Sequence, residues 1–172
     1  MSHYRRVFVP GGCYFFTVVT RDRAPVFTTP ARVALLRAAV RQVMAAHPFS
    51  IDAMVVLPDH LHCIWRLPEG DADFPGRWRE IKKATSRRIH RVADRGDQWP
   101  IWQPRFWEHL LRDEADWRRH LDYIHYNPVK HGLARSAGAW PWSSFGRCVA
   151  RGWYEPGWGT SEPPLVAGMD PE

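Results

Sequence analysis

The sequence lacks any apolar run long enough to cross a membrane. Its longest runs, residues 13–19 and 53–57, are far shorter than the roughly 20 residues that a membrane-spanning helix needs. The basic pair Arg5 and Arg6 is not followed by the apolar segment of a secretory leader. We therefore expect a protein that does not enter a membrane and that stays in the cytoplasm.

Cysteine is scarce as well. The three cysteines, Cys13, Cys63 and Cys148, are odd in number and show no CxxC spacing. This pattern argues against a disulfide framework and against a zinc site built from thiolates. It fits a reducing compartment.

Basic residues are missing from the last part of the chain. Residues 152–172 hold no Lys or Arg but four acids, whereas the whole chain has 24 Lys and Arg against 18 Asp and Glu. The first 151 residues therefore carry 24 basic side chains against 14 acidic ones, a net charge of +10. A basic body that is also rich in aromatic residues favours a nucleic-acid partner, although a solvated basic surface has the same composition.

The length and the 45% hydrophobic content suit one domain, which we place at residues 1–154, followed by an irregular tail at 155–172 that is rich in Pro and Gly. Hydrophobic periodicity and turn residues predict strands at 14–21, 51–57, 60–65 and within 99–109, and helices at 30–46, 77–91 and from Asp113 onward. This order predicts an α+β fold, a ferredoxin-like split βαβ antiparallel sheet with helices on one face and an appended helix.

Local signals support these boundaries. Thr29 followed by proline is typical of a helix start, and the Pro58-Asp59 turn separates two strands of a hairpin. In the helix that starts at Asp113, we expect Pro128 to force Asn127 out of helical geometry.

The helix at 77–91 has two distinct sides. We expect Trp78, Ile81, Thr85 and Val92 to face inward. Arg79, Lys83, Arg87 and Arg91 recur every four residues on another side. This stripe can follow a phosphate backbone, or it is an ordinary exposed helix face.

Two histidines begin the second strand of the hairpin. Side chains alternate along a strand, so His60 and His62 point to one side while Leu61 and Cys63 point to the other, toward the core. Two imidazoles on one side can share a cation, although histidines at this spacing are often surface or hydrogen-bonded residues.

The last predicted helix carries Tyr123 and, four residues later, Asn127. Residues at this spacing lie on the same side of a helix, so one helix can bring a phenol and an amide ligand to the histidines. A tyrosine at such a position can also be a packing residue. Tyr126 is a competing nucleophile, about 60° around the helix from Tyr123.

Several separated segments resemble one family. The segment LPDHLHCIW is similar to the His-hydrophobe-His motif, and LDYIHYNPVKHGL to the tyrosine helix, of the REP-associated tyrosine transposases in the HUH single-strand nuclease superfamily. The resemblance covers residues 4–154 and includes the segments YFFTVVTR, FPGRWREIKK, IWQPRFWEH and WPWSSF.

The resemblance implies an enzyme that cleaves and rejoins single-stranded DNA at repetitive extragenic palindromic (REP) elements. These elements fold into hairpins that carry a short 5′ recognition tetranucleotide. It assigns Tyr123 as the nucleophile that forms a 5′-phosphotyrosine, His60 and His62 as metal ligands, and Asn127 as a third ligand. The divalent cation is expected to be Mg²⁺ or Mn²⁺. The sequence has no GxxxxGK[ST] loop, which agrees with resealing that needs no ATP.

Hairpin recognition has several candidates. They are Arg5 and Arg6, the stripe on the second helix, and Lys130 and His131 after the tyrosine helix. Unpaired bases can stack on Trp102, Phe106 or Trp107, unless these residues belong to the core.

Two other functions remain open at this point. The fold can serve a hairpin-binding protein that does not cleave, or a metal-dependent phosphodiesterase that uses activated water in place of Tyr123. The REP-associated branch includes monomers, whereas related insertion-sequence transposases work as dimers with tyrosines exchanged between subunits. The sequence does not choose between a monomer and a homodimer.

Overall fold

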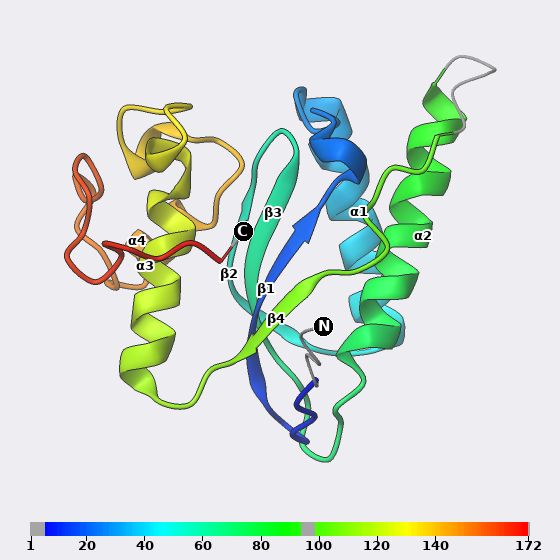
Figure 1. Cartoon of the computed structure of the whole chain (residues 1–172), viewed down its shortest axis with the longest axis horizontal. Coiled ribbons are helices and arrows are strands. Elements are labelled where there is room, and N and C mark those ends of the chain that lie inside the picture. Colours follow the sequence, from blue (N-terminus) through cyan, green and yellow to red (C-terminus); the bar gives the residue numbers. More distant parts are fainter. Residues whose placement is uncertain (1–5, 94–98, 172) are drawn as a thin grey trace.

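Four antiparallel strands form a sheet at the centre of the protein, in the order β2-β3-β1-β4. They are β1 Cys13–Val19, β2 Ser50–Val56, β3 His60–Arg66 and β4 Trp107–Leu110, in a computed structural model that describes residues 6–93 and 99–171. Helix α1 (Pro30–Ala46) connects β1 to β2, and α2 (Phe74–Val92) connects β3 to β4. The predicted ferredoxin-like split βαβ arrangement is confirmed (Figure 1).

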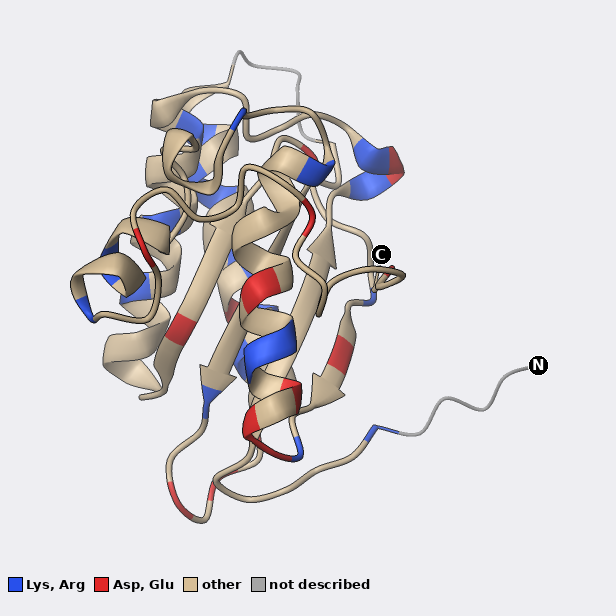
Figure 2. Ribbon diagram, turned by 90° about the vertical axis from the view of Figure 1, so that its left-hand side faces the viewer, with Lys and Arg blue, Asp and Glu red and all other residues tan. Residues whose placement is uncertain are grey.

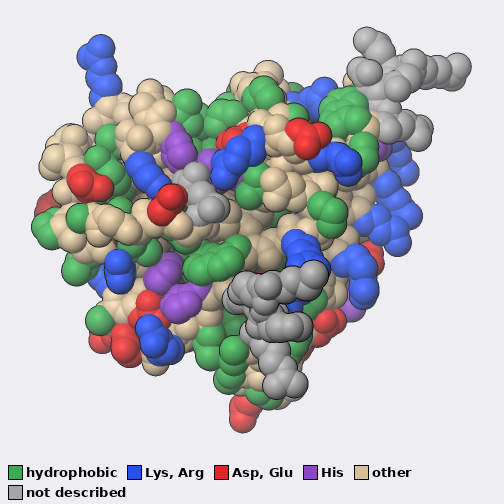
Figure 3. All heavy atoms as spheres, viewed as in Figure 1, with side chains coloured by type: hydrophobic (Ala, Val, Ile, Leu, Met, Phe, Trp, Pro, Cys, Tyr) green, Lys and Arg blue, Asp and Glu red, His purple; other side chains and the backbone are tan. Residues whose placement is uncertain are grey.

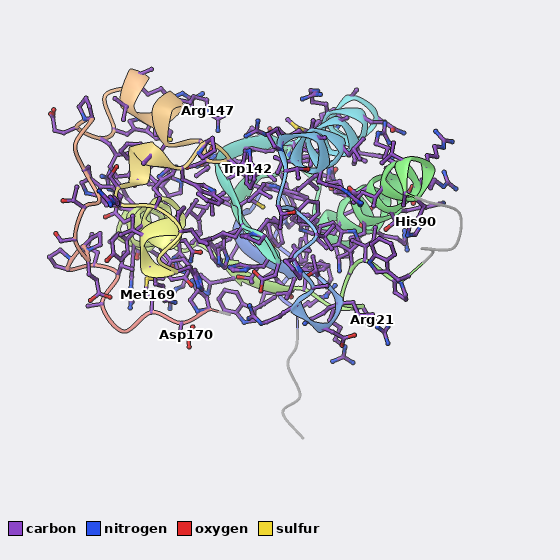
Figure 4. All side chains as sticks on the ribbon, turned by 90° about the horizontal axis from the view of Figure 1, so that it is seen from above. Arg21, His90, Trp142, Arg147, Met169 and Asp170 are labelled. Carbon is purple, nitrogen blue, oxygen red and sulfur yellow. The ribbon has the colours of Figure 1, made fainter. Side chains whose placement is uncertain are left out.

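Both connecting helices pack on the same face of the sheet (Figure 4). Helix α1 begins as predicted, with the Thr29 hydroxyl accepting a hydrogen bond from the backbone N–H of Arg32. Helix α2 begins earlier than predicted, because the Asp73 carboxylate caps it by accepting from the N–H of Gly76. Between this layer and the sheet, the rings of Trp65 and Trp78 stack with their centroids 4.3 Å apart.

Helix α3 (Glu114–Lys130) lies on the opposite face of the sheet, together with the short α4 (Phe145–Ala150) (Figures 1 and 4). Both faces are therefore covered, and a second core forms around Phe15, Ile64 and Leu121. Figure 2 shows α3 in front of the sheet, with acidic residues near its start. The appended helix thus encloses the side of β3 that carries His60 and His62.

The expectation for Asn127 was wrong. Pro128 lies inside α3, and Asn127 is part of the helix. A proline inside a helix removes one backbone hydrogen bond, but the chain continues the helix with a bond from the N–H of His131 to the carbonyl of Asn127. Burial of residues 120–128 stabilises this last part of the helix despite the lost bond. Tyr123 therefore lies about two turns before the end of α3.

Two further expectations, the inward position of Val92 and the extent of the last strand, differ from the structure. Val92 does not face inward, because its side chain is 65% exposed at the end of α2, and Ile89 takes the buried position. The last strand is a short edge strand that pairs only with β1 among the described strands. The prolines at 100 and 104 precede it and keep the chain from pairing earlier, except for one bridge between Thr20 and Trp102.

Residues 151–171 form turns but no helix or strand. This segment runs along α3 and returns to the sheet (Figures 1 and 4). The Val166 side chain is buried in the second core, and the Arg119 side chain donates to the carbonyl of Leu165. In the described part of the chain, no helix has the length and apolar character needed to cross a membrane.

Candidate active site

The histidines of β3 form a buried pair beneath α3. Their ring centroids lie 4.9 Å apart with the planes at 77°, and at most 2% of either residue is exposed. As the alternation along the strand predicts, Leu61 and Cys63 point to the other face, into the core under α1 and α2. The two imidazoles thus share one enclosed space rather than a solvated surface.

His60 is oriented by the residue before it. Its Nδ1 lies 2.6 Å from a carboxylate oxygen of Asp59, whose other oxygen accepts from Arg23 at 3.2 Å. Burial by itself raises the pKa of the Asp59 carboxyl group, but the hydrogen bond from His60 and the charge of Arg23 outweigh this and lower the pKa. An ionised Asp59 accepts the Nδ1 proton of His60, which places the unshared electron pair of the ring on Nε2.

His62 is oriented by Thr17, which is its direct partner across β1 and β3. The Thr17 hydroxyl oxygen lies 2.9 Å from Nδ1 of His62 and donates its proton to the carbonyl of Pro171 at 2.8 Å. Because the hydroxyl has one proton, it must accept from Nδ1 of His62. His62 therefore also keeps its unshared pair on Nε2.

Tyr123 lies directly against this pair. Its ring centroid is 5.2 Å from that of His62 with the planes at 75°, and its side chain is fully buried. The Lys130 ammonium group donates to the Tyr123 hydroxyl at 3.2 Å. Tyr126 packs in the same core, but among the described residues its ring contacts neither histidine of the pair.

Asn127 follows Tyr123 by one turn and is fully buried. Within the described part of the chain, neither its amide nitrogen nor its amide oxygen has a hydrogen-bond partner. A buried amide without partners is costly and is typical of a site that takes a ligand. Two imidazole nitrogens and an amide oxygen form a donor set that fits a divalent cation such as Mn²⁺ or Mg²⁺.

The predicted DNA-contacting residues fall into separate places. Lys130 belongs to the tyrosine site, and the His131 ring lies 5.3 Å from that of His60, so His131 also borders this site. Arg6 pairs with Glu108 at 3.3 Å, and Arg5 lies outside the described residues. The predicted stripe of Arg79, Lys83, Arg87 and Arg91 is exposed on α2, on the far side of the sheet from α3. Figure 3 shows Lys and Arg side chains gathered at the right-hand edge, where α2 lies.

Other basic and aromatic residues have structural roles. Arg77 is 3% exposed and holds Asp71 at 2.6 Å, so it is not available to a phosphate. Trp102 and Phe106 belong to the core under α1 and α2, whereas Trp107 is 38% exposed. Of the three proposed stacking residues, Trp107 offers the most open ring.

A basic cleft opens beside the histidine end of the sheet. It has a volume of about 790 Å³ and is lined by Arg21, Asp22, Arg23, Gln103, Pro104 and Arg105. The ion pair between Arg23 and Asp59 connects this cleft to His60. Asp22 and Arg23 both have positive φ angles, 54° and 50°, which is an uncommon conformation for residues with a side chain.

The end of the described chain contacts the same site. Besides the bond from Thr17 to Pro171, the Asp170 carboxylate lies 3.5 Å from the Lys130 ammonium group. Sequence patterns gave no signal for these contacts or for the role of Thr17. Asp59 had one signal, its position next to His60.

A split βαβ sheet with a buried histidine pair facing a helix-borne tyrosine defines the class of HUH single-strand nucleases. Comparison with known proteins agrees. A family described as "Transposase IS200 like" matches residues 9–111. An Escherichia coli K12 protein named "REP-associated tyrosine transposase" is 50% identical over 158 residues, which is 92% of this chain and 91% of that protein. A Haemophilus influenzae relative named for the same family is 41% identical over 92% of this chain and 94% of its own.

A solved structure shows the same fold over nearly the whole chain. It is a REP-associated tyrosine transposase bound to a REP hairpin, with a TM-score of 0.83, 46% identity and 99% of both chains covered. The chain therefore belongs to the IS200-like transposase family and, within it, to the REP-associated tyrosine transposases.

Proposed function

We propose that this transposase is a metal-dependent endonuclease and strand transferase that acts on single-stranded DNA at REP-type hairpins. Its covalent intermediate is a 5′-phosphotyrosine on Tyr123. The observation that carries this proposal is the contact of the Tyr123 ring with His62, with the Lys130 ammonium group 3.2 Å from the Tyr123 hydroxyl. A phenol, an ammonium group and two imidazoles thus lie together, and these are the groups that the proposed reaction needs.

Nε2 of His60, Nε2 of His62 and the amide oxygen of Asn127 would hold the metal. When bound, Mn²⁺ or Mg²⁺ supplies positive charge to the scissile phosphate and offsets the charge that develops there. Asp59 and Thr17 fix the tautomers of the two imidazoles, so that Nε2 of each ring, which carries no proton, would be available to the metal.

Tyr123 provides the covalent step. Its hydroxyl oxygen attacks phosphorus and gives its proton to solvent water. The bond from phosphorus to the 3′ oxygen breaks, and the departing 3′ oxygen takes a proton from solvent water. Lys130 stabilises the negative charge that grows on the phenolic oxygen during attack. A second 3′-hydroxyl can then displace Tyr123 and reseal the strand, because the phosphotyrosyl bond retains the bond energy.

The choice of substrate rests on the relatives and on charge. The similar solved protein is bound to a REP hairpin, and the exposed stripe on α2 and the cleft with Arg21 and Arg105 can contact phosphates. We propose that a hairpin with a 5′ tetranucleotide is the partner, met at the nucleoid in the cytoplasm. Residues 1–154 form the nuclease unit, and residues 155–172 form its tail.

The arrangement within one chain favours a monomer as the catalytic unit. His62 and Tyr123 of the same chain are already in ring contact, and Lys130 of that chain contacts the hydroxyl. A partner chain is not needed to supply the tyrosine. A homodimer with exchanged tyrosine helices is the alternative arrangement.

The test uses matched tyrosine variants. Wild type, Tyr123→Phe and Tyr126→Phe are incubated with end-labelled single-stranded REP hairpins and Mn²⁺ or Mg²⁺, and covalent adducts are resolved on denaturing gels. We expect a metal-dependent adduct with wild type and Tyr126→Phe and none with Tyr123→Phe. An adduct that is retained in Tyr123→Phe and lost in Tyr126→Phe would transfer the nucleophile role to Tyr126.

The same gels distinguish the proposed function from the two alternatives, a phosphodiesterase and a hairpin-binding protein. Cleavage by Tyr123→Phe without an adduct would indicate a phosphodiesterase that uses water. Hairpin binding without cleavage by any variant would indicate a binding protein.

A further inference from the structure

A second group of metal-ligand side chains lies between the edge strand β4 and helix α3. His109 comes from β4, and Asp116 and His120 come from α3, one turn apart. Each residue offers one ligand atom, and the three atoms lie within 4.8 Å of one another. This group plays no part in the tyrosine site.

The two imidazoles approach the same carboxylate from both sides. Nε2 of His109 lies 2.9 Å from one carboxylate oxygen of Asp116, and Nδ1 of His120 lies 3.2 Å from the other and 2.8 Å from the Asp116 backbone carbonyl. The two rings stack with centroids 4.8 Å apart at 21°. Ligands of tetrahedral zinc lie about 3.4 Å from one another, given bonds of about 2.1 Å. The three ligand atoms, within 4.8 Å of one another, are close to this spacing.

A backbone hydrogen bond sets the tautomer of His120. Its Nδ1 donates to the backbone carbonyl of Asp116 at 2.8 Å, one turn earlier on α3. Since a carbonyl oxygen only accepts, a neutral ring keeps its unshared electron pair on Nε2. A metal-ligating histidine typically donates its other ring nitrogen in this way.

Access from solvent is open on one side. The His109 side chain is 28% exposed, whereas those of Asp116 and His120 are 12% and 8% exposed. Two ligands are therefore held firmly by α3, and the third lies at the surface where an ion can enter. The fourth position of a tetrahedral ion would face solvent and take a water molecule.

We propose that His109, Asp116 and His120 form a second site, which binds Zn²⁺ and fastens the tyrosine helix to the edge of the sheet. Phe15 separates this site from the histidine pair, since its ring lies 4.8 Å from that of His120 and 5.5 Å from that of His62. His120 precedes Tyr123 by three residues on α3. An ion between β4 and α3 thus limits movement of the turn that leads into Tyr123.

Metal stoichiometry tests the proposal without reference to DNA cleavage. Metal-free protein is titrated with Zn²⁺ by calorimetry at pH 7, with His109→Gln as the key variant and the exposed His47→Gln as the matched control. We expect His109→Gln to bind one equivalent of Zn²⁺ fewer than wild type and His47→Gln to bind the same number. Equal stoichiometry in His109→Gln and wild type would overturn the proposal.

A second variant isolates the new site from the first. The double variant His60→Gln and His62→Gln removes the histidine pair and should still bind one equivalent of Zn²⁺. Saturating Zn²⁺ should raise its Tm by about 5 °C, a shift that adding His109→Gln abolishes. Co²⁺ in place of Zn²⁺ should give the visible absorption bands of a tetrahedral site. Absence of both the shift and the bands in a folded double variant would show that the group is a hydrogen-bonded triad without a metal.

Discussion

The ammonium nitrogen of Lys130 lies 3.2 Å from the hydroxyl oxygen of Tyr123 and 5.0 Å from the centre of its ring. The two residues are seven positions apart, which is two turns of α3, so one rigid helix sets their separation. Lys130 is therefore placed to act on the proposed nucleophile, in addition to any contact with the DNA backbone.

We predict that Lys130→Met slows adduct formation by about 10- to 100-fold at saturating hairpin, because a hydrogen bond to a charged group is worth about 1.5–3 kcal/mol. Lys130→Arg should retain part of the rate. The exposed Lys83→Met is the control and should change only binding. If Lys130→Met weakens hairpin binding but leaves the rate at saturation unchanged, Lys130 is a DNA-contacting residue only.

The tail offers a second prediction. Pro171 accepts the Thr17 proton beside His62, and Asp170 pairs with Lys130, so the tail competes with DNA for the tyrosine site. A chain that ends at Gly168 should form the adduct roughly tenfold faster, in line with the loss of one hydrogen bond and one ion pair. Single-turnover cleavage rates provide the measurement.

Two point variants sharpen this test. Asp170→Asn removes one contact of the tail, so a smaller increase in rate is expected. Glu162→Gln changes an exposed tail acid that no described ion pair involves, and it should leave the rate unchanged. Identical rates for the shortened and full chains would show that the tail does not restrain cleavage.

His125 predicts how stability depends on pH. Burial, with the charges of Arg118 and Arg147, lowers its pKa from 6.5 to about 3, so the folded protein keeps this ring neutral. The unfolded chain takes up a proton below pH 6.5 and the folded chain does not. The stability that the neutral ring provides is present above pH 6.5 and is lost as the pH falls toward 3.

Within that window, the free energy of unfolding should fall by up to about 1.4 kcal/mol per pH unit from this group alone. Urea denaturation of wild type and His125→Gln between pH 4 and 7 measures it. The variant should be less stable at pH 7, because it loses the hydrogen bond with Ser144, but it should depend less on pH. Parallel curves for the two proteins would contradict this assignment.

The cleft beside His60 predicts where single-stranded DNA binds. Arg21 points away from the molecule at the rim of this cleft (Figure 4), and Arg105 lines it as well. Arg21→Ala and Arg105→Ala should each weaken hairpin binding. Each should also reduce the slope of log Kd against log salt concentration by about one. Arg41→Ala, an exposed arginine on α1, serves as the control. An equal effect of all three changes would indicate that binding depends on overall charge alone.

The sequence by itself determined the features that depend on short-range periodicity and chemistry. Alternation along the strand put His60 and His62 on one side, and the Thr29-Pro30 pair fixed the start of α1. The order of strands and helices predicted the split βαβ sheet, and the two motifs predicted the family. Each of these depends on neighbours in the chain, which is why a single sequence was sufficient.

Only the tertiary structure determined the contacts between residues that lie far apart in the sequence. The packing of α3 against the sheet brought Tyr123 to His62 and kept Asn127 helical despite Pro128, because burial outweighed the local preference for a helix end. The return of the tail to Thr17 joined residues 154 positions apart. The same packing set His109 of β4 against Asp116 and His120 of α3. Sequence spacing does not encode these contacts, since they arise only when two faces of the sheet are closed by different helices.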